Sequence, residues 1–145
     1  MITATEIIAA FLSLHPHSPA NNCIVSRREV IEEALNTSQT TYPQMPIEMF
    51  ATIGYMETHM GCYGNGNWGA PISARQRHIA GPPARAAAIL WRSFEVCGNW
   101  EAAARRFRTG LCGHTTIGDR YSRTAMQIAN SIRMEVNRQK ANNSR

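Results

Sequence analysis

Glu57 is the residue whose type and position best suit general acid–base chemistry. Phe50, Ile53 and Gly54 share one helical face with it, at the spacing i, i+3, i+4 and i+7. A carboxylate on such an apolar face is partly buried, which disfavours its charged form and raises its pKa. A raised pKa suits a general acid near neutral pH. The alternative is a frayed helix end at which Glu57 is solvated.

The elements that must position Glu57 are predicted to be helices joined by turn-rich loops. Pro46 suits the first position of a helix over residues 46–58. Thr3 and Glu6 form a capping-box pattern ahead of a helix to about residue 14, and Ser26 and Glu29 repeat it ahead of a second helical face. Residues 37–44 are expected to be a polar loop.

The second half of the chain predicts three more helices. The first covers residues 82–97 and is ended by Gly98, and the second covers residues 100–109, between Asn99 as N-cap and Gly110. Asp119 is the expected N-cap of the last helix, and residues 140–145 are expected to fray. Residues 61–83 carry five glycines and three prolines in a long connection, which we interpret as a cleft wall.

Length and charge limit the classes of protein. A chain of 145 residues predicts a single domain over residues 1–145, with helical scaffold in 1–45, a core in 46–139 and a tail in 140–145. The net charge of +5 and the pI near 9.4 favour a polyanionic partner: nucleic acid, an acidic membrane surface or the anionic bacterial wall. No apolar run is long enough to span a membrane. The N-terminus has no basic residue ahead of its apolar stretch, which argues against a secretory signal.

The cysteines and histidines predict neither a metal site nor a cofactor. The separations of Cys23, Cys62, Cys97 and Cys112 are long and irregular, without a C-x-x-C pair. We interpret the cysteines as free thiols. One or two disulfides are the alternative if the protein works outside the cytoplasm. The five histidines are scattered, so no set of metal ligands is expected.

The order of these pieces resembles the soluble lytic transglycosylase and goose-type lysozyme group of lysozyme-like proteins. The first motif of that group, a catalytic Glu usually followed by Ser, resembles Glu57 and Thr58. Its third motif is similar to NWEAAARRFRTG, in which Phe107 takes the Tyr position and Arg108 takes the Asn position. A downstream tyrosine faces the catalytic Glu in that group, and Tyr121 lies at a matching distance along the chain.

The second motif of the group, Gly-Leu-Met-Gln, is not visible, and either residues 69–72 or Gln76 could take its place. The resemblance covers roughly residues 47–132. It implies an all-α, lysozyme-like domain of about six helices with a glycine-rich cleft loop. It also implies a glycosidase that degrades peptidoglycan glycan strands at the β-1,4 bond between N-acetylmuramic acid and N-acetylglucosamine.

Catalysis would then use Glu57 alone as acid and base, with Tyr121 bonding the substrate's acetamido group or Glu57 itself. A lytic transglycosylase is the preferred activity, and lysozyme-type hydrolysis stays open. The expected substrate contacts are Thr58, Trp68, Gln76 and Arg108. Trp68 would stack on a sugar, or else pack under the loop.

Several other side chains receive structural or electrostatic roles. Four aromatic residues at helical spacing are expected in the core: Trp91, Phe94, Trp100 and Phe107. Five arginines flank the expected cleft and would draw the protein to an anionic wall: Arg105, Arg106, Arg108, Arg120 and Arg123.

Two alternatives come from other classes. The first is a small basic helical nucleic-acid-binding module, although the basic residues do not gather on one recognition helix. The second is a non-catalytic structural protein on a lysozyme-like scaffold. Because the sequence shows no export signal, delivery to the wall would use a phage particle, a holin or a secretion machine. Association with a virion or with such a machine is an accompanying possibility.

Overall fold

A computed structural model describes residues 1–64, 66–69 and 82–144. These residues form helices and no strand, which confirms the all-α prediction. The described helices are α1 (Ala4–Leu14), α2 (Asn21–Ser26), α3 (Arg28–Thr41), α4 (Ile47–Thr58), α5 (Pro83–Cys97), α6 (Trp100–Thr109) and α7 (Thr116–Asn143). None of them is both long and apolar enough to cross a bilayer.

Local sequence explains most helix ends. The predicted capping box of α1 is present, since the Thr3 hydroxyl accepts from the Glu6 N–H and the Glu6 carboxylate accepts from the Thr3 N–H. Asn99 caps α6 by accepting from the N–H of Ala102 at 2.8 Å. Gly98 and Gly110 end α5 and α6 in the left-handed conformation, as predicted.

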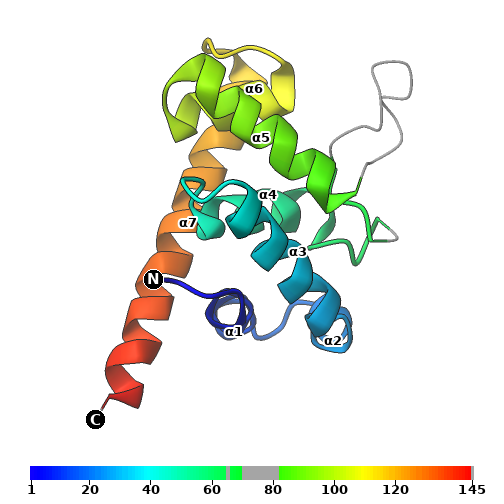
Figure 1. Cartoon of the computed structure of the whole chain (residues 1–145), viewed down its shortest axis with the longest axis vertical. Helices are drawn as coiled ribbons and strands as arrows, with labels where there is room; N and C mark the ends of the chain where they lie inside the picture. Colours follow the sequence, from blue (N-terminus) through cyan, green and yellow to red (C-terminus); the bar gives the residue numbers. More distant parts are fainter. Residues whose placement is uncertain (65, 70–81, 145) are drawn as a thin grey trace.

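Helix α4 lies at the centre of the molecule, and the long α7 crosses it (Figure 1). Helices α5 and α6 pack together at one end, and α1 and α2 lie at the other. Every residue of α4 from Ile47 to Gly54 is buried, so this helix is covered on all sides by its neighbours. The last turn of α4 carries Glu57 and lies beside α7 and α6.

Several helix boundaries differ from the predictions. Ser26 is the last residue of α2, where its hydroxyl donates to the Cys23 carbonyl, so it caps nothing. Helix α3 continues into the expected loop and ends at Thr41. The hydroxyls of Thr40 and Thr41 donate to carbonyls one turn back, so these polar side chains are satisfied within the helix. The N-cap of α7 is Thr115 in place of Asp119, and that helix extends through the expected frayed tail to Asn143.

All four cysteines form disulfides, which corrects the preference for free thiols. Cys23 of α2 bonds Cys62 in the loop after α4, and Cys97 at the end of α5 bonds Cys112 in the loop after α6. Sequence spacing could not reveal these pairs, because residues that lie far apart in the chain are brought together only by helix packing. Disulfides of this kind persist in oxidising compartments.

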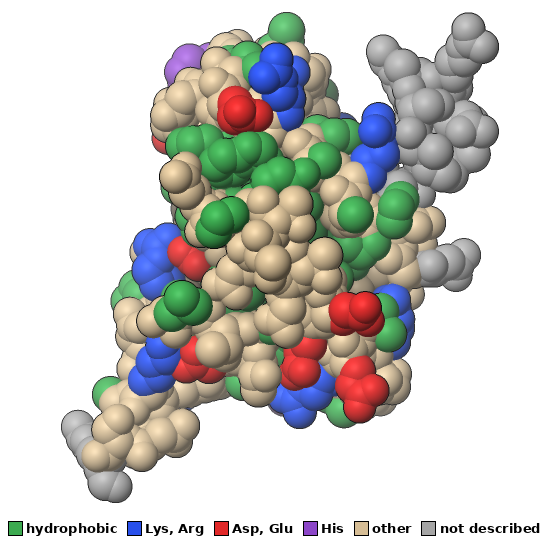
Figure 2. Space-filling model, in the orientation of Figure 1, with side chains coloured by type: hydrophobic (Ala, Val, Ile, Leu, Met, Phe, Trp, Pro, Cys, Tyr) green, Lys and Arg blue, Asp and Glu red, His purple; other side chains and the backbone are tan. Residues whose placement is uncertain are grey.

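Charges of both signs share the surface. On the face drawn in Figure 2, Lys and Arg side chains lie beside Asp and Glu side chains. Hydrophobic side chains gather mainly in its upper half. This face therefore does not offer the continuous basic stripe that a nucleic-acid-binding surface requires.

Candidate functional site

Glu57 and Tyr121 meet across the contact between α4 and α7. The Tyr121 hydroxyl donates a hydrogen bond of 3.0 Å to Oε1 of Glu57, although the two residues are 64 positions apart in the sequence. Glu57 is partly buried on the last turn of α4, and Tyr121 is partly buried on the second turn of α7. The structure thus brings together Glu57, predicted as an acid from its apolar helical face, and Tyr121, whose role the family resemblance implied.

Burial sets the protonation of this pair. Desolvation raises the pKa of Glu57, and the Tyr121 hydrogen bond and the Arg108 charge lower it by less. The pKa of Tyr121 is raised by burial first, and then by the charge and the hydrogen bond of Glu57. The phenol therefore keeps its proton and acts as the donor, while Glu57 is biased toward its protonated form, as a general acid requires.

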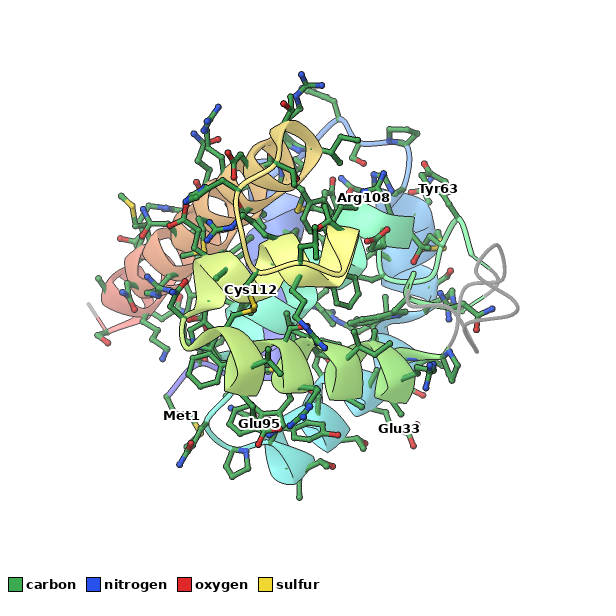
Figure 3. The ribbon with its side chains drawn as sticks, turned by 90° about the horizontal axis from the view of Figure 1, so that it is seen from above. Met1, Glu33, Tyr63, Glu95, Arg108 and Cys112 are labelled. Atoms are coloured by element: carbon green, nitrogen blue, oxygen red, sulfur yellow. A yellow bond between two sulfur atoms is a disulfide. The ribbon has the colours of Figure 1, made fainter. Side chains whose placement is uncertain are left out.

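Arg108 supplies positive charge to the same site. It is exposed near the end of α6, as Figure 3 shows, and its charge acts on both Glu57 and Tyr121. An arginine here partly offsets the burial of Glu57 and stabilises the carboxylate that remains after proton transfer. Of the residues predicted to contact substrate, Arg108 is the one that the described structure places beside the pair.

Gly69 lies against the side chain of Glu57. A Cβ built on this residue would lie 2.5 Å from both Cβ and Cγ of Glu57, so the loop backbone packs directly on the carboxylate's stem. Its φ of +90° also favours glycine. Gly69 of the glycine-rich segment is therefore in contact with Glu57, and the interpretation of that segment as a cleft wall stays a prediction.

Thr58 fastens this loop and has little capacity left for substrate. Its hydroxyl donates to the Asn67 carbonyl at 2.6 Å and accepts from the Gly61 N–H at 2.9 Å. The side chain is buried and lies against Gly64. The structure thus corrects the predicted substrate contact, and Thr58 is a positioning residue for the loop that covers Glu57.

Two further anchors of the loop come from the N-terminal third of the chain. The Arg27 guanidinium donates to the Met60 carbonyl at 3.2 Å and lies beside Gly61 and Gly66. The Cys23–Cys62 disulfide ties α2 to the same segment. The sequence alone gives Arg27 no such role, because nothing in the local sequence links it to glycines more than 30 positions away.

Trp68 packs under the loop, so its predicted role in sugar stacking is wrong for this structure. The side chain is 1% exposed. Its ring lies 4.8 Å from that of Phe50 and fills the space beside Gly54, where a Cβ would come within 2.4 Å of it. A buried ring of this kind holds the loop onto α4. Gln76, another predicted substrate contact, lies outside the described residues.

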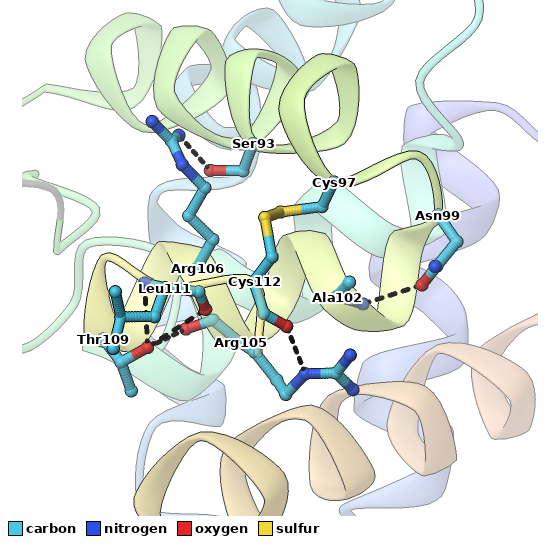
Figure 4. Close-up of a disulfide and its surroundings, with 9 residues drawn as sticks. All are labelled: Ser93, Cys97, Asn99, Ala102, Arg105, Arg106, Thr109, Leu111 and Cys112. Atoms are coloured by element: carbon cyan, nitrogen blue, oxygen red, sulfur yellow. Dashed lines mark hydrogen bonds between the residues drawn. A yellow bond between two sulfur atoms is a disulfide. The ribbon is translucent and has the colours of Figure 1, made fainter. Parts of the chain in front are cut away.

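Two of the five predicted cleft arginines are used inside the structure. Arg105 is buried, with its Nε donating to the Cys112 carbonyl at 2.8 Å, and Arg106 donates to the Ser93 hydroxyl at 3.0 Å (Figure 4). These bonds and the adjacent disulfide hold the end of α6 against α5. They fix the helix that carries Arg108.

The aromatic residues predicted for the core pack as expected. All four are partly buried and lie against the central cluster. Phe94 and Trp100 stack with centroids 4.1 Å apart, and Trp91 lies 5.6 Å from Phe94. These rings join α5 to α6 at a distance from the pair.

No protein-family model, curated protein or solved structure matches this chain. The site geometry is therefore the structural basis for any functional proposal. Among the described residues, no three His, Cys, Asp or Glu side chains gather as metal ligands. The chemistry that these residues offer is proton transfer by Glu57, supported by Tyr121 and Arg108.

Proposed function

We propose that this protein is a lysozyme-like muralytic glycosidase, acting on peptidoglycan as a lytic transglycosylase. The observation that carries the proposal is the 3.0 Å hydrogen bond from Tyr121 to the partly buried Glu57. A carboxyl group whose pKa is raised by burial can donate a proton near neutral pH. The family resemblance of the Glu57 and Arg108 segments supplies the substrate class.

In the proposed reaction, protonated Glu57 donates its proton to the oxygen of the β-1,4 bond between N-acetylmuramic acid and N-acetylglucosamine. The C–O bond breaks, and the acetamido group of the muramic acid stabilises the resulting cation. The Glu57 carboxylate then removes a proton from the same sugar's 6-hydroxyl, whose oxygen closes on the cationic carbon to give an anhydro product. Attack by water in that step would give hydrolysis instead.

A single-carboxylate scheme agrees with the partners of the other acidic residues. The carboxylates that the sequence offers as a second catalytic group each have a partner elsewhere. Glu95 forms an ion pair with Arg92 and Glu101 with Arg105, and Asp119 lies 2.9 Å from Nδ1 of His114. The only partners identified for Glu57 among the described residues are Tyr121 and Arg108.

The proposed place of action is the bacterial wall. Two disulfides favour a protein that works in an oxidising compartment. Delivery by a phage particle, through a holin-type opening or by a secretion machine would bring the protein there. Its basic net charge favours adsorption to the anionic wall polymer.

The deciding experiment is mass spectrometry of purified peptidoglycan after incubation with the wild-type protein and with Glu57→Gln. Anhydro-muropeptides from the wild type alone are expected. Reducing-end products would instead assign a lysozyme. If neither protein releases soluble products, the enzyme proposal fails for this substrate. Wall binding without cleavage would then favour a structural protein, and salt-sensitive DNA binding would favour a nucleic-acid-binding module.

A further inference from the structure

A hollow of about 380 Å³ lies beside the Glu57–Tyr121 pair, and the proton transfers proposed above give it no role. Helices α4, α6 and α7 all contribute to it. Its lining residues are Met56, Arg108, Ile117, Arg120, Tyr121 and Thr124. Tyr121 joins the hollow to the pair, because the same side chain lines the hollow and donates to Glu57.

The charge of this hollow is positive. Arg108 and Arg120 are both exposed, and no acidic side chain belongs to the lining. Within the described residues, neither arginine forms an ion pair, whereas Arg105, Arg133 and Arg138 each have a glutamate partner. Two guanidinium groups thus line one hollow, and among the described residues Glu57, whose pKa the Arg108 charge lowers, forms no ion pair with either of them.

The rest of the lining sets the size and polarity of a ligand. Met56 and the exposed Ile117 supply apolar surface, and the Thr124 side chain supplies a hydroxyl group. A small anionic substituent that also carries alkyl groups matches this combination. Guanidinium groups suit carboxylates, because their planar fork can donate two parallel hydrogen bonds to both oxygens.

We propose that this hollow is a subsite for a carboxylate carried by the glycan, with Arg108 and Arg120 as its ligands. The inference rests on the proposed function and specifies its substrate as an anionic amino-sugar polymer, in distinction to a neutral one such as chitin. The carboxylate could be that of the lactyl ether on muramic acid, or one carried by the attached peptide. Both sources share the chemistry that the arginines recognise.

The test compares kcat/KM on three substrates. Intact peptidoglycan carries peptide carboxylates, glycan strands stripped of peptides by an amidase carry free lactyl carboxylates, and chitin oligomers carry neither. Arg120→Gln removes one proposed ligand. Arg123→Gln is the matched control, since it removes the same charge one turn along α7 from an exposed residue outside the hollow.

We expect Arg120→Gln to lower kcat/KM by roughly tenfold or more on at least one carboxylate-bearing substrate, the scale of a lost charged hydrogen bond. Arg123→Gln is expected to change it little. A loss on intact peptidoglycan would identify peptide carboxylates, and a loss on stripped strands would identify the lactyl group. Arg120→Lys should recover part of the loss by restoring the charge without the fork.

Two results would overturn the proposed subsite, and a third would overturn the glycosidase proposal on which it rests. Equal effects of the two Gln variants on every substrate would remove the specific role of Arg120. An equal loss on chitin oligomers would show that the effect of Arg120→Gln does not depend on a carboxylate. If the wild type cleaves none of the substrates, the glycosidase proposal itself fails, whereas cleavage without an Arg120 effect leaves that proposal standing.

Discussion

Gly69 and Glu57 are in direct contact, with the glycine backbone lying on the stem of the carboxylate. Any Cβ at residue 69 would come within 2.5 Å of Glu57, and the φ of +90° disfavours side chains independently of that contact. The loop and the proposed catalytic group therefore cannot move independently. Substitutions that displace the loop should change the chemistry of Glu57 as well as the stability of the fold.

Gly69→Ala should separate these two effects when it is compared with Gly98→Ala. Gly98 has nearly the same φ, +86°, but a Cβ added to it would meet nothing within 4 Å. Both variants should lose about 1–2 kcal/mol of unfolding free energy from backbone strain. Only Gly69→Ala should also lose glycan cleavage, on the order of 100-fold, because it displaces Glu57. Equal activities in a cleavage assay, together with equal melting curves, would contradict the contact.

Tyr121→Phe should move the alkaline limb of the pH–rate profile to higher pH. The Tyr121 hydrogen bond lowers the pKa of Glu57, so its loss leaves desolvation less opposed and the pKa rises further. An acid with a higher pKa stays protonated to a higher pH. Arg108→Gln removes a positive charge and should shift the limb in the same direction. A shift to lower pH in either variant would exclude this electrostatic description of the site.

Glu57→Gln should stabilise the fold more at neutral than at mildly acidic pH. Because the folded-state pKa of Glu57 is raised, the folded chain binds more protons than the unfolded chain between the two pKa values. The unfolding free energy of the wild type therefore falls as pH rises through that window. The variant lacks this titration. Thermal melts at both pH values measure the difference, and a variant that is less stable than the wild type at neutral pH would contradict it.

The sequence was most informative where chemistry and periodicity coincide. The helix starts at Thr3 and Asn99 followed from their caps. The apolar stripe of Phe50, Ile53 and Gly54 predicted the partial burial of Glu57, although α4 is buried on every side from Ile47 to Gly54 and not on that face alone. The proximity of Tyr121 to Glu57 could not come from periodicity, because it depends on how α7 crosses α4. It was expected only from the family resemblance.

The incorrect predictions have two causes. Two residues near one helix start could both act as its cap, and the burial of other residues depends on packing between distant helices. Asp119 was a plausible cap, yet Thr115 starts α7, and Asp119 instead contacts His114. Gly118 made this helix start hard to predict, because glycine is a poor helix former. In the structure Gly118 is buried, and a larger residue would not fit, since a Cβ there would lie 2.8 Å from the Thr115 hydroxyl oxygen. The buried position of Trp68 depends on Gly54 one helix away, and no local pattern reports such a contact.

Loss of the Cys23–Cys62 disulfide should reduce activity more than loss of the Cys97–Cys112 disulfide does, although the two losses should cost similar amounts of stability. This bond closes 39 positions of sequence and Cys97–Cys112 closes 15, so a chain-entropy argument gives stabilities of about 4 and about 3 kcal/mol. The difference is small. Their positions differ more, because Cys62 belongs to the loop whose Gly69 packs on Glu57. The Cys97–Cys112 bond instead holds α6, whose exposed Arg108 acts on Glu57 through its charge.

Cysteine-to-serine pairs at each disulfide provide the comparison. Both double variants should melt at lower temperature, by similar amounts. The Cys23→Ser/Cys62→Ser protein should in addition lose most glycan cleavage below its melting temperature, since only the non-covalent contacts of Arg27, Thr58 and Trp68 would then hold the loop. Thiol reductant should inactivate the wild type but cause no further loss in this variant. If the Cys97→Ser/Cys112→Ser protein loses as much activity at matched stability, the disulfides act only through the overall fold, and the Cys23–Cys62 bond has no specific role in placing Glu57.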